Sequence, residues 1–366
     1  MKPVWTPILL CVFLFAGGNR IKGKYSTSES TPVAKNLVII TLDGIRWQDV
    51  FKGADSSILN DPDYNDDTAI SKLLYWNSDL AERRKLLMPF LWKVMAKKGQ
   101  MMGNRDLGNN FNISNFYGIS YPGYNEMFTG HSDAGIRSNK KHWNRNLNVL
   151  EYLSTLSEFN NKVAVFASWD VFPYILNTKR NGLKANCGYD SSNNGLTSDR
   201  FTKLQSLALQ EEEHTATRDD RLTYAAAKIY LKTASPRVLV IGLGEADEMA
   251  HQGKYDQYLM RIKEYDNILS DLWLTIRADP ALRDNTTILL TTDHGRGSGS
   301  KTWTDHNMLV KGSFQGWMGI MGPGIPALGE VKLDIDNYLE QLAQTIACIL
   351  GKKFEIGDPA PPLALQ

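Results

Sequence analysis

"TTILLTTDHGRGSGSKTWTDHN", residues Thr286–Asn307, contains the pattern that decides the fold. An apolar run rich in β-branched residues stops at Asp293-His294-Gly295, and small and polar residues then lead to a second histidine, His306. Such a continuous run, bounded by turn-forming residues, is typical of a strand that is buried on both faces. The stretch therefore predicts two metal-capable side chains at a strand end and a third across a loop.

Comparable apolar runs recur along the chain, and they read "NLVIITLDG" from Asn36, "KVAVFAS" from Lys162, "RVLVIGLGEAD" from Arg237 and "GWMGIMG" from Gly316. Apolar residues at helical spacing lie between them, from Met88 to Gly99 and from Tyr255 to Asp279. This alternation predicts an α/β fold with a mostly parallel central sheet sandwiched by helices. Ligand sites in such folds form beyond the carboxyl ends of the strands, which is where Asp43, Asp247 and Asp293 fall.

Composition indicates a globular protein without an electrostatic preference for polyanions. The chain has 366 residues, of which 42% are hydrophobic and 22% charged, and this length fits one large α/β domain or two ordinary ones. The net charge is +1, from 41 basic and 40 acidic residues. We therefore expect no binding of nucleic acid polymers, and any anionic substrate must be held by a local site.

The first residues have the order of a secretory signal. Lys2 precedes an apolar run from Val4 to Ala16, and small residues follow. We predict a signal peptide over residues 1–18, a linker over 19–35, and a secreted or periplasmic protein with no stable membrane span after signal removal; the alternative is an uncleaved anchor. Outside the signal, Cys187 and Cys348 could pair in an oxidising compartment.

The remainder is predicted to be one catalytic α/β domain over residues 36–357, with an insertion near 53–84 and a C-terminal tail over 358–366. Within the insertion, Asp61–Lys72 invites a calcium-loop interpretation. It lacks the glycine at the sixth place and the glutamate at the twelfth, so we predict a solvated loop instead.

Three aspartates and three histidines make up the candidate site. Asp247 and His251 are four residues apart, so on a helical turn they share one face. An aspartate that closes a strand is more often a cap or a turn former, and only the whole set indicates a site. Mixed nitrogen and oxygen ligands suit zinc, or manganese and similar ions, better than calcium, and their number suits two divalent ions. The complete set is Asp43, Asp247, His251, Asp293, His294 and His306.

The order of these motifs resembles the alkaline phosphatase superfamily of two-metal hydrolases, and by motif its nucleotide pyrophosphatase/phosphodiesterase-like branch. The likeness runs from Asn36 to about Gly351, and "SYPGYNEMFTG" matches the nucleophile segment of that branch. The resemblance implies that Ser120 is the nucleophile and that Asn139 hydrogen-bonds a phosphoryl oxygen. It assigns one ion to Asp43, Ser120, Asp293 and His294, and the other to Asp247, His251 and His306.

The chain departs from the pattern of that family at three places. Gly123 stands where an asparagine commonly follows the proline, and the segment before Asn139 is shorter than usual. Some phosphomonoesterases of the superfamily carry a Lys/Arg pair where this chain has Asp170 and Phe172. The last difference argues against a simple monoesterase.

These observations predict a secreted two-metal hydrolase that cleaves a small-molecule phosphate ester through a phosphoserine on Ser120. Metal coordination makes a serine hydroxyl a usable nucleophile because it lowers the pKa of that hydroxyl. Thr129 is the reserve nucleophile. Aromatic side chains near these motifs are more often core, but four could line a substrate pocket. They are Tyr121, Tyr124, Trp143 and Trp169.

Two other functions stay open. One is a sulfatase of the same superfamily, since Ser120 and Pro122 share the Ser-x-Pro element of the sulfatase maturation motif, although Tyr124 stands where an arginine is expected. The other is an inactive binding protein with this fold, against which the intact ligand set argues. The remaining histidines are not expected to be ligands, and they are His131, His142 and His214.

Overall fold

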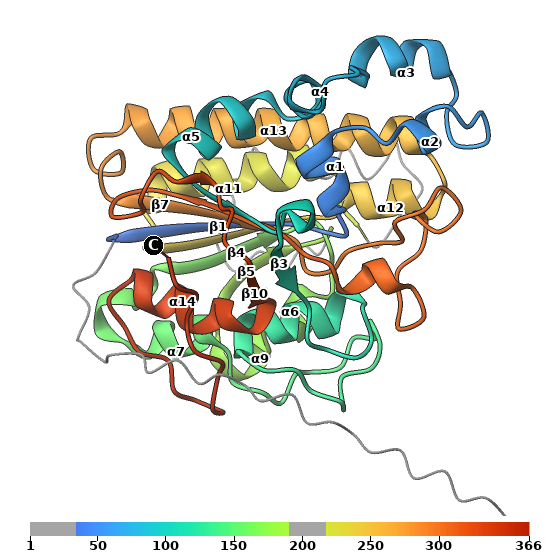
Figure 1. Ribbon diagram of the computed structural model, residues 1–366. Coiled ribbons are helices and arrows are strands. Elements are labelled where there is room, and N and C mark those ends of the chain that lie inside the picture. The colour runs from blue at the N-terminus through green and yellow to red at the C-terminus, as the bar shows by residue number, and fades with distance from the viewer. Residues whose placement is uncertain (1–33, 190–216, 366) are drawn as a thin grey trace, which may run out of the picture.

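The computed structural model describes residues 34–189 and 217–365 (Figure 1). The predicted signal peptide, all but the last two residues of the predicted linker, and His214 lie outside the described residues.

An eight-stranded sheet forms the centre of the domain, in the order β5-β4-β6-β1-β7-β8-β2-β9. Five neighbouring strands are parallel: β5 (Lys184–Cys187), β4 (Val163–Ala167), β6 (Val238–Leu243), β1 (Asn36–Leu42) and β7 (Thr286–Thr291). Strand β8 (Met318–Met321) runs antiparallel to β7 and to β2 (Gly99–Met102), and β9 (Gly329–Glu330) pairs with β2 in parallel. The predicted mostly parallel sheet is confirmed.

Strand β1 shows why these apolar runs form the middle of the sheet. It pairs with β6 on one side and β7 on the other, so both of its edges are hydrogen-bonded. Alternate side chains enter two separate cores, with Val38 and Ile40 on one face and Leu37 and Ile39 on the other. A strand with both faces covered must be apolar at nearly every position, as this one is.

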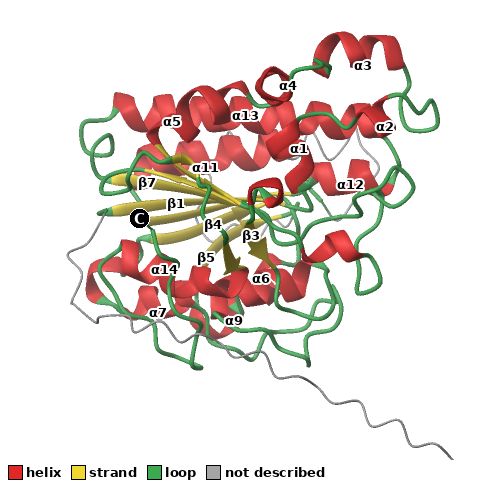
Figure 2. Cartoon of the chain, in the orientation of Figure 1, coloured by secondary structure: helices red, strands yellow, loops and turns green. Residues whose placement is uncertain are grey.

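Helices cover both faces of the sheet (Figures 1 and 2). One layer holds α1 (Trp47–Lys52), α11 (Asp220–Ala234), α12 (Glu245–His251), the long α13 (Tyr255–Ala278), and a π-helix (Leu91–Met95) that continues into α5 (Ala96–Lys98). The other layer holds α6 (Ser120–Thr129), α7 (Val149–Thr155), α8 (Phe172–Ile175), α9 (Thr178–Asn181) and α14 (Leu342–Ile349), beside a small parallel sheet of β3 (Asn109–Asn112) and β10 (Ile335–Tyr338).

The segment predicted as an insertion forms three short helices, α2 (Ser56–Leu59), α3 (Thr68–Tyr75) and α4 (Leu80–Leu87). An aspartate caps the N-terminus of each one, as a carboxylate can by accepting the free backbone N–H groups. The solvated loop predicted over Asp61–Lys72 is therefore wrong in its second part, because Asp67 caps α3 and the chain is helical from Thr68.

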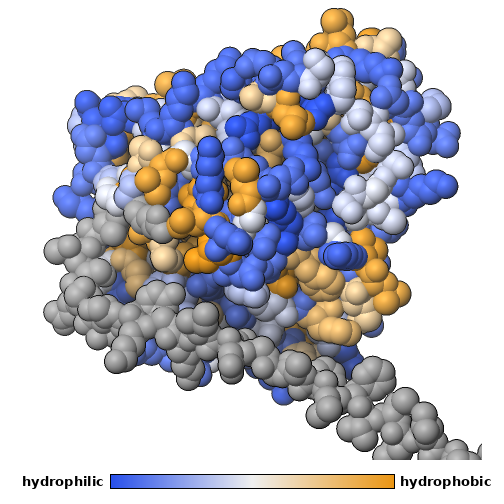
Figure 3. Space-filling view, viewed as in Figure 1, coloured by the Kyte–Doolittle hydropathy of each residue, from blue (hydrophilic) through white to orange (hydrophobic). Residues whose placement is uncertain are grey.

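The surface, the cysteines and the start of the described chain have the following properties. The face in Figure 3 is mostly hydrophilic, with separate apolar patches. Among the described residues, no helix is both long enough and apolar enough to cross a membrane. Cys187 and Cys348 are free thiols, so the possible disulfide between them is not formed. The backbone N–H of Ala34 donates to the carbonyl of Ile349 at 3.0 Å, which ties the start of β1 to the end of α14.

Candidate active site

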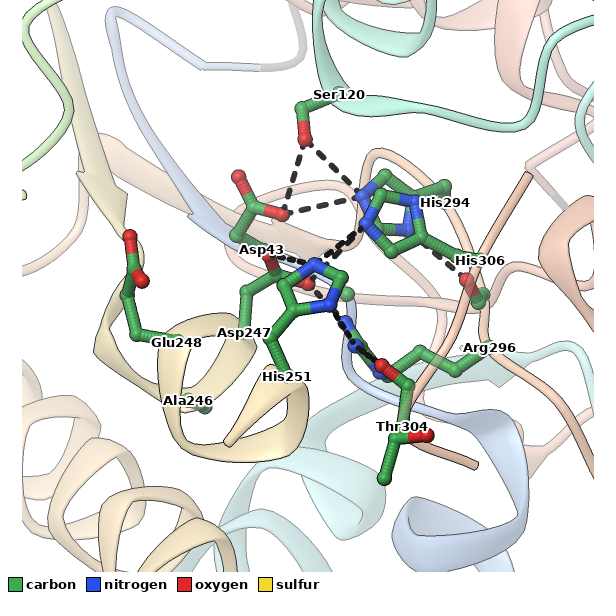
Figure 4. A network of polar contacts seen from close by, with 12 residues as sticks. Asp43, Ser120, Ala246, Asp247, Glu248, His251, His294, Arg296, Thr304 and His306 are labelled. Carbon is green, nitrogen blue, oxygen red and sulfur yellow. Dashed lines mark hydrogen bonds and ion pairs between the residues drawn. The ribbon is translucent and has the colours of Figure 1, made fainter. Parts of the chain in front are cut away.

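The carboxyl ends of β1, β6 and β7 bring the predicted site together. Asp43 directly follows β1, Asp293 follows β7 after one threonine, and Asp247 lies in α12, which begins just after β6. Gly44 makes the close approach possible, because a β-carbon there would lie 2.4 Å from Oδ1 of Asp247 and the residue has a φ of +61°. Figure 4 shows Asp43, Ser120, Asp247 and the three histidines grouped at this edge.

The first half of the site surrounds the hydroxyl of Ser120. This residue is the first of α6, and its Oγ lies 3.1 Å from Nε2 of His294 and 3.5 Å from Oδ1 of Asp43. Nε2 of His294 also lies 3.2 Å from Asp43 Oδ1 and 3.6 Å from Asp293 Oδ2. Four side chains from β1, β7 and α6 thus converge within contact distance.

Local hydrogen bonds orient this half. Nδ1 of His294 donates to the carbonyl of Gly295 at 2.9 Å, which leaves the lone pair of Nε2 facing the carboxylates. Oδ1 of Asp293 accepts the backbone N–H of Gly44 at 3.2 Å, whereas Oδ2 is buried and accepts no hydrogen bond. Burial raises the pKa of both Asp43 and Asp293 well above the ordinary value, and neighbouring carboxylates raise it further.

The second half consists of Asp247, His251 and His306. On α12, Nε2 of His251 lies 3.2 Å from Oδ2 of Asp247, as the four-residue spacing predicted. His306 places its Nε2 3.0 Å from that of His251 and 3.8 Å from Asp247 Oδ1, and its ring stacks on His294 at 3.7 Å between centroids. Nδ1 of His306 donates to the carbonyl of Gly118 at 3.0 Å. Burial lowers the pKa of His306 well below the ordinary value.

Arg296 belongs to this half, and the sequence reasoning missed it. Its guanidinium is almost completely buried; Nη1 pairs with Asp247 Oδ1, Nη2 lies 3.3 Å from His251 Nδ1, and Nε donates to the carbonyl of Trp303 at 2.9 Å. Burial alone would raise the pKa of Asp247. The positive charge of Arg296, and to a smaller extent His306, instead holds this pKa well below the ordinary value. The available signal was a lone arginine between two glycines, two residues after His294.

A second residue that the sequence reasoning missed holds α12 in place. Asp220 is buried and accepts the backbone N–H groups of Gly244 and Glu245 at 2.9 Å each. These are N–H groups at the start of α12 that have no partner within the helix, so the carboxylate fixes the helix start. Asp220 thereby positions Asp247, two residues further along. Asp220 lies at the beginning of α11, where the sequence offers only an Asp-Asp pair.

Helix α6 passes so close to β7 that one glycine is required. A β-carbon at Gly123 would lie 2.3 Å from the carbonyl oxygen of Asp293. The departure from the family pattern at Gly123 therefore has a local reason. Asn139 lies beside the start of α6, where its Oδ1 accepts the backbone N–H of Tyr121 at 3.0 Å.

The aromatic residues are placed differently from one another. Tyr124 is 1% exposed, packs on Phe172 in the core, and hydrogen-bonds Thr41, so the structure does not place it in an open pocket. Tyr121 is also buried, and its hydroxyl donates to the carbonyl of His142 at 2.6 Å. Trp169 is half-buried and follows β4 at the edge of the sheet that carries the site.

The reserve nucleophile Thr129 and the two described histidines outside the predicted ligand set have other surroundings. Thr129 is buried, and its hydroxyl donates to the carbonyl of Asn125. His131 contacts the Thr129 hydroxyl through Nδ1 at 2.9 Å. His142 lines a hollow of about 460 Å³ beside α6, together with Arg137, Lys140, Trp143 and Arg145.

The donor set suits divalent cations. Two groups of ligand atoms lie close enough to hold one, Asp43 with Asp293 and His294, and Asp247 with His294 and His306. The buried Oδ2 of Asp293, which accepts no hydrogen bond, is the observation that argues most directly for a cation. Carboxylate and imidazole ligands in these numbers fit zinc or manganese.

No protein-family model and no curated protein matches this sequence significantly. Solved structures match it in fold. Alkaline phosphatase PafA has 12% identity and a TM-score of 0.63 over 91% of this chain and 99% of its own. A 2-O GAG sulfatase has 13% identity and a TM-score of 0.56 over 90% and 73%. A phosphonate monoester hydrolase from Silicibacter pomeroyi has 12% identity and a TM-score of 0.56, and the match covers 90% of this chain and 76% of that one. The chain therefore has the fold shared by these members of the alkaline phosphatase superfamily, as the motif order predicted.

Proposed function

We propose that this chain is a metal-dependent hydrolase of the alkaline phosphatase superfamily that cleaves small-molecule phosphate esters through Ser120. The observation that carries the proposal is the position of the Ser120 hydroxyl, 3.1 Å from His294 Nε2 and 3.5 Å from Asp43 Oδ1. The buried Oδ2 of Asp293, which accepts no hydrogen bond, lies in the same cluster. With the predicted signal peptide, we propose that the enzyme acts outside the cytoplasm.

Asp43, Ser120, Asp293 and His294 would hold one divalent cation, and Asp247 and His306, with His251 beside them, would surround a second. Bound cations of this kind supply a lower pKa for the serine hydroxyl and positive charge for the oxygens of the phosphoryl group. The imidazoles of His294 and His306 are ready for this task, because a backbone carbonyl fixes Nδ1 as the donor in each ring.

Ser120 attacks phosphorus in line after its hydroxyl proton has passed to solvent. The Oγ–P bond forms while the bond from phosphorus to the ester oxygen breaks, and the departing alcohol takes a proton from water. Water then attacks the phosphoserine, which releases phosphate, or a phosphate monoester from a diester substrate, and restores the hydroxyl. Because Oδ1 of Asn139 already accepts the N–H of Tyr121, its amide nitrogen is left to donate to a phosphoryl oxygen.

The hollow beside α6 is the proposed place for the remainder of the substrate. Its lining residues Ser138 and Lys140 flank Asn139, and Tyr121 follows Ser120, so it adjoins the proposed phosphoryl position. Arg137, Lys140 and Arg145 contribute positive charge, and Trp143 is 39% exposed. This combination suits an ester with an additional anionic group or an aromatic ring.

The direct test compares an aryl phosphate, a bis-aryl phosphate and an aryl sulfate as substrates of the purified protein, with and without chelator. We expect chelator-sensitive turnover of a phosphate ester, abolished in Ser120→Ala and retained in Ser154→Ala, a helix-surface serine on α7. Preferential turnover of the sulfate ester would favour the sulfatase alternative. Unchanged turnover by Ser120→Ala would remove this serine from the mechanism.

A further inference from the structure

The three histidines of the site do not present the same atom to a cation. In His294 and His306, Nδ1 lies 2.9 Å and 3.0 Å from a backbone carbonyl. A carbonyl can only accept, so each Nδ1 carries the proton and each Nε2 keeps its lone pair. These two rings are therefore in the form in which a histidine binds a metal through Nε2.

His251 has the opposite arrangement. Its Nδ1 lies 3.3 Å from Nη2 of Arg296, and a guanidinium can only donate. Nδ1 must therefore accept, and in the neutral ring the proton is carried by Nε2. The atoms around this Nε2 agree, because Oδ2 of Asp247 lies at 3.2 Å and Nε2 of His306 at 3.0 Å, and both are acceptors.

Arg296 cannot easily leave this position. Its guanidinium is fixed by the carbonyls of Trp303 and Thr304 as well as by Asp247. Nη1 also lies close to Gly44, where it would be 2.9 Å from an added β-carbon. A permanent positive charge is thus already paired with Oδ1 of Asp247, and it repels a further cation held by that carboxylate.

We infer that Arg296 makes the two cation sites unequal. The site of Asp43, Asp293 and His294 binds its cation tightly, whereas the site of Asp247 and His306 binds a second one weakly. His251 serves as a hydrogen-bond donor held by Arg296 and is not a ligand. This departs from the ligand set that the family resemblance implies, and it rests on the cation binding of the proposed function but not on the identity of the ester.

The first experiment titrates Zn²⁺ or Mn²⁺ into the metal-free protein by calorimetry, with bound metal counted by elemental analysis. We expect one tight site and a second site that is weaker by about 100-fold. His251→Ala should change neither affinity by more than about threefold, whereas His306→Ala should remove the second binding event. The side chain of His251 is 42% exposed, so its replacement leaves the fold intact. Loss of the second cation in His251→Ala would overturn the inference.

The second experiment removes the guanidinium. Arg296→Met should raise the affinity for the second cation by about 10- to 100-fold, because the repelling charge is gone and His251 is then free to bind through Nε2. His251→Ala in the Arg296→Met background should remove the part of that gain that comes from His251, although it has little effect alone. Arg296→Lys keeps the charge and should keep the second site weak. A lower second affinity in folded Arg296→Met would mean that the arginine supports the site, contrary to the inference.

The outcomes separate this inference from the proposed function. Two cations of equal affinity, together with chelator-sensitive phosphoester turnover, would refute the role of Arg296 and leave the hydrolase intact. The absence of any cation binding by the unaltered protein would refute both.

Discussion

The buried carboxylates of the two halves of the site differ in what neutralises their negative charge. Asp43 and Asp293 lie at strand ends, and among the described residues the only basic side chain paired with either carboxylate is His294, whose Nε2 carries no proton. Burial raises the pKa of both carboxyls. Asp247 lies on a helix beside Arg296, which lowers its pKa. The carboxylates of the first half thus need a bound cation to neutralise them, whereas Asp247 in the second half is already paired with the guanidinium of Arg296.

The largest effect should come from the nucleophile of the first half. Ser120→Ala removes the hydroxyl that lies beside both His294 Nε2 and Asp43 Oδ1, so phosphoester turnover should fall by at least about a thousandfold. Initial rates at saturating substrate and fixed metal measure this loss. Cation affinity should fall less than turnover; an equal loss of both would mean that the serine acts only as a ligand.

Replacing one aspartate in each half should give opposite results in the metal-free protein. Asp247→Asn leaves Arg296 buried without a carboxylate and should cost about 3–5 kcal/mol in the free energy of unfolding. Asp293→Asn removes a carboxyl whose charge is disfavoured by burial, so it should stabilise the protein at neutral pH. Urea unfolding of metal-free samples measures both, and destabilisation by both variants would break the contrast.

The same pair should show opposite pH dependence. The pKa of Asp293 is raised on folding, so the folded state binds more protons and its stability falls as the pH rises above the unfolded value. The pKa of Asp247 is lowered on folding, so its contribution is present above the unfolded value and is lost as the pH falls. The gain in the free energy of unfolding that Asp293→Asn gives over the unaltered protein should therefore grow as the pH rises. The free energy of unfolding that Asp247→Asn loses should become smaller as the pH falls.

Glu126 supports the second half from a distance. It is buried and accepts the N–H groups of Ser114 and Asn115, which anchors the loop whose Gly118 carbonyl orients His306. Burial raises its pKa to about 7, so the unaltered protein should lose up to about 3 kcal/mol of stability between pH 4.5 and 7. Unfolding of Glu126→Gln across this range should lack that slope, and an identical slope would contradict the assignment.

A smaller effect should appear where α6 meets the first half. Gly123→Ala places a methyl group against the Asp293 carbonyl, so we expect a loss of about 1–3 kcal/mol and a weaker tight cation site. Gly182→Ala is a matched control for side-chain volume, because a β-carbon there meets nothing within 4 Å. Gly182 has a φ of +65°, so the control still carries a backbone cost, and only the difference between the two variants reports on packing.

The sequence predicted the parts of the molecule that have strong local patterns. Long β-branched runs gave β1, β6 and β7, and the residues that follow parallel strands must meet at one edge. Strand β2, with two methionines, and the two-residue β9 have no such pattern, because only pairing with neighbours makes them strands. Tyr124 was one of four aromatic residues considered for a substrate pocket, although its spacing from Tyr121 and Phe128 is that of a core helix face.

Arg296 was beyond sequence reasoning for a different reason. Its partners Asp247 and His251 lie on α12, far away in the sequence, and nothing local distinguishes a buried arginine in a glycine-rich stretch from a solvated one. The hydrogen bonds that set the ring forms of the histidines depend likewise on backbone carbonyls, such as that of Gly118, which only the folded chain brings near.

The tie between Ala34 and Ile349 has a practical consequence. It fixes the beginning of β1 at the edge of the sheet opposite to Asp43, and seven extended residues separate the two edges by about 23 Å. A tether or fusion partner joined ahead of Ala34 is therefore attached on the side of the domain opposite to the candidate active site. Immobilising the protein through that end should leave the reaction edge open to bulky esters, whereas attachment near the loop after His294 should block them.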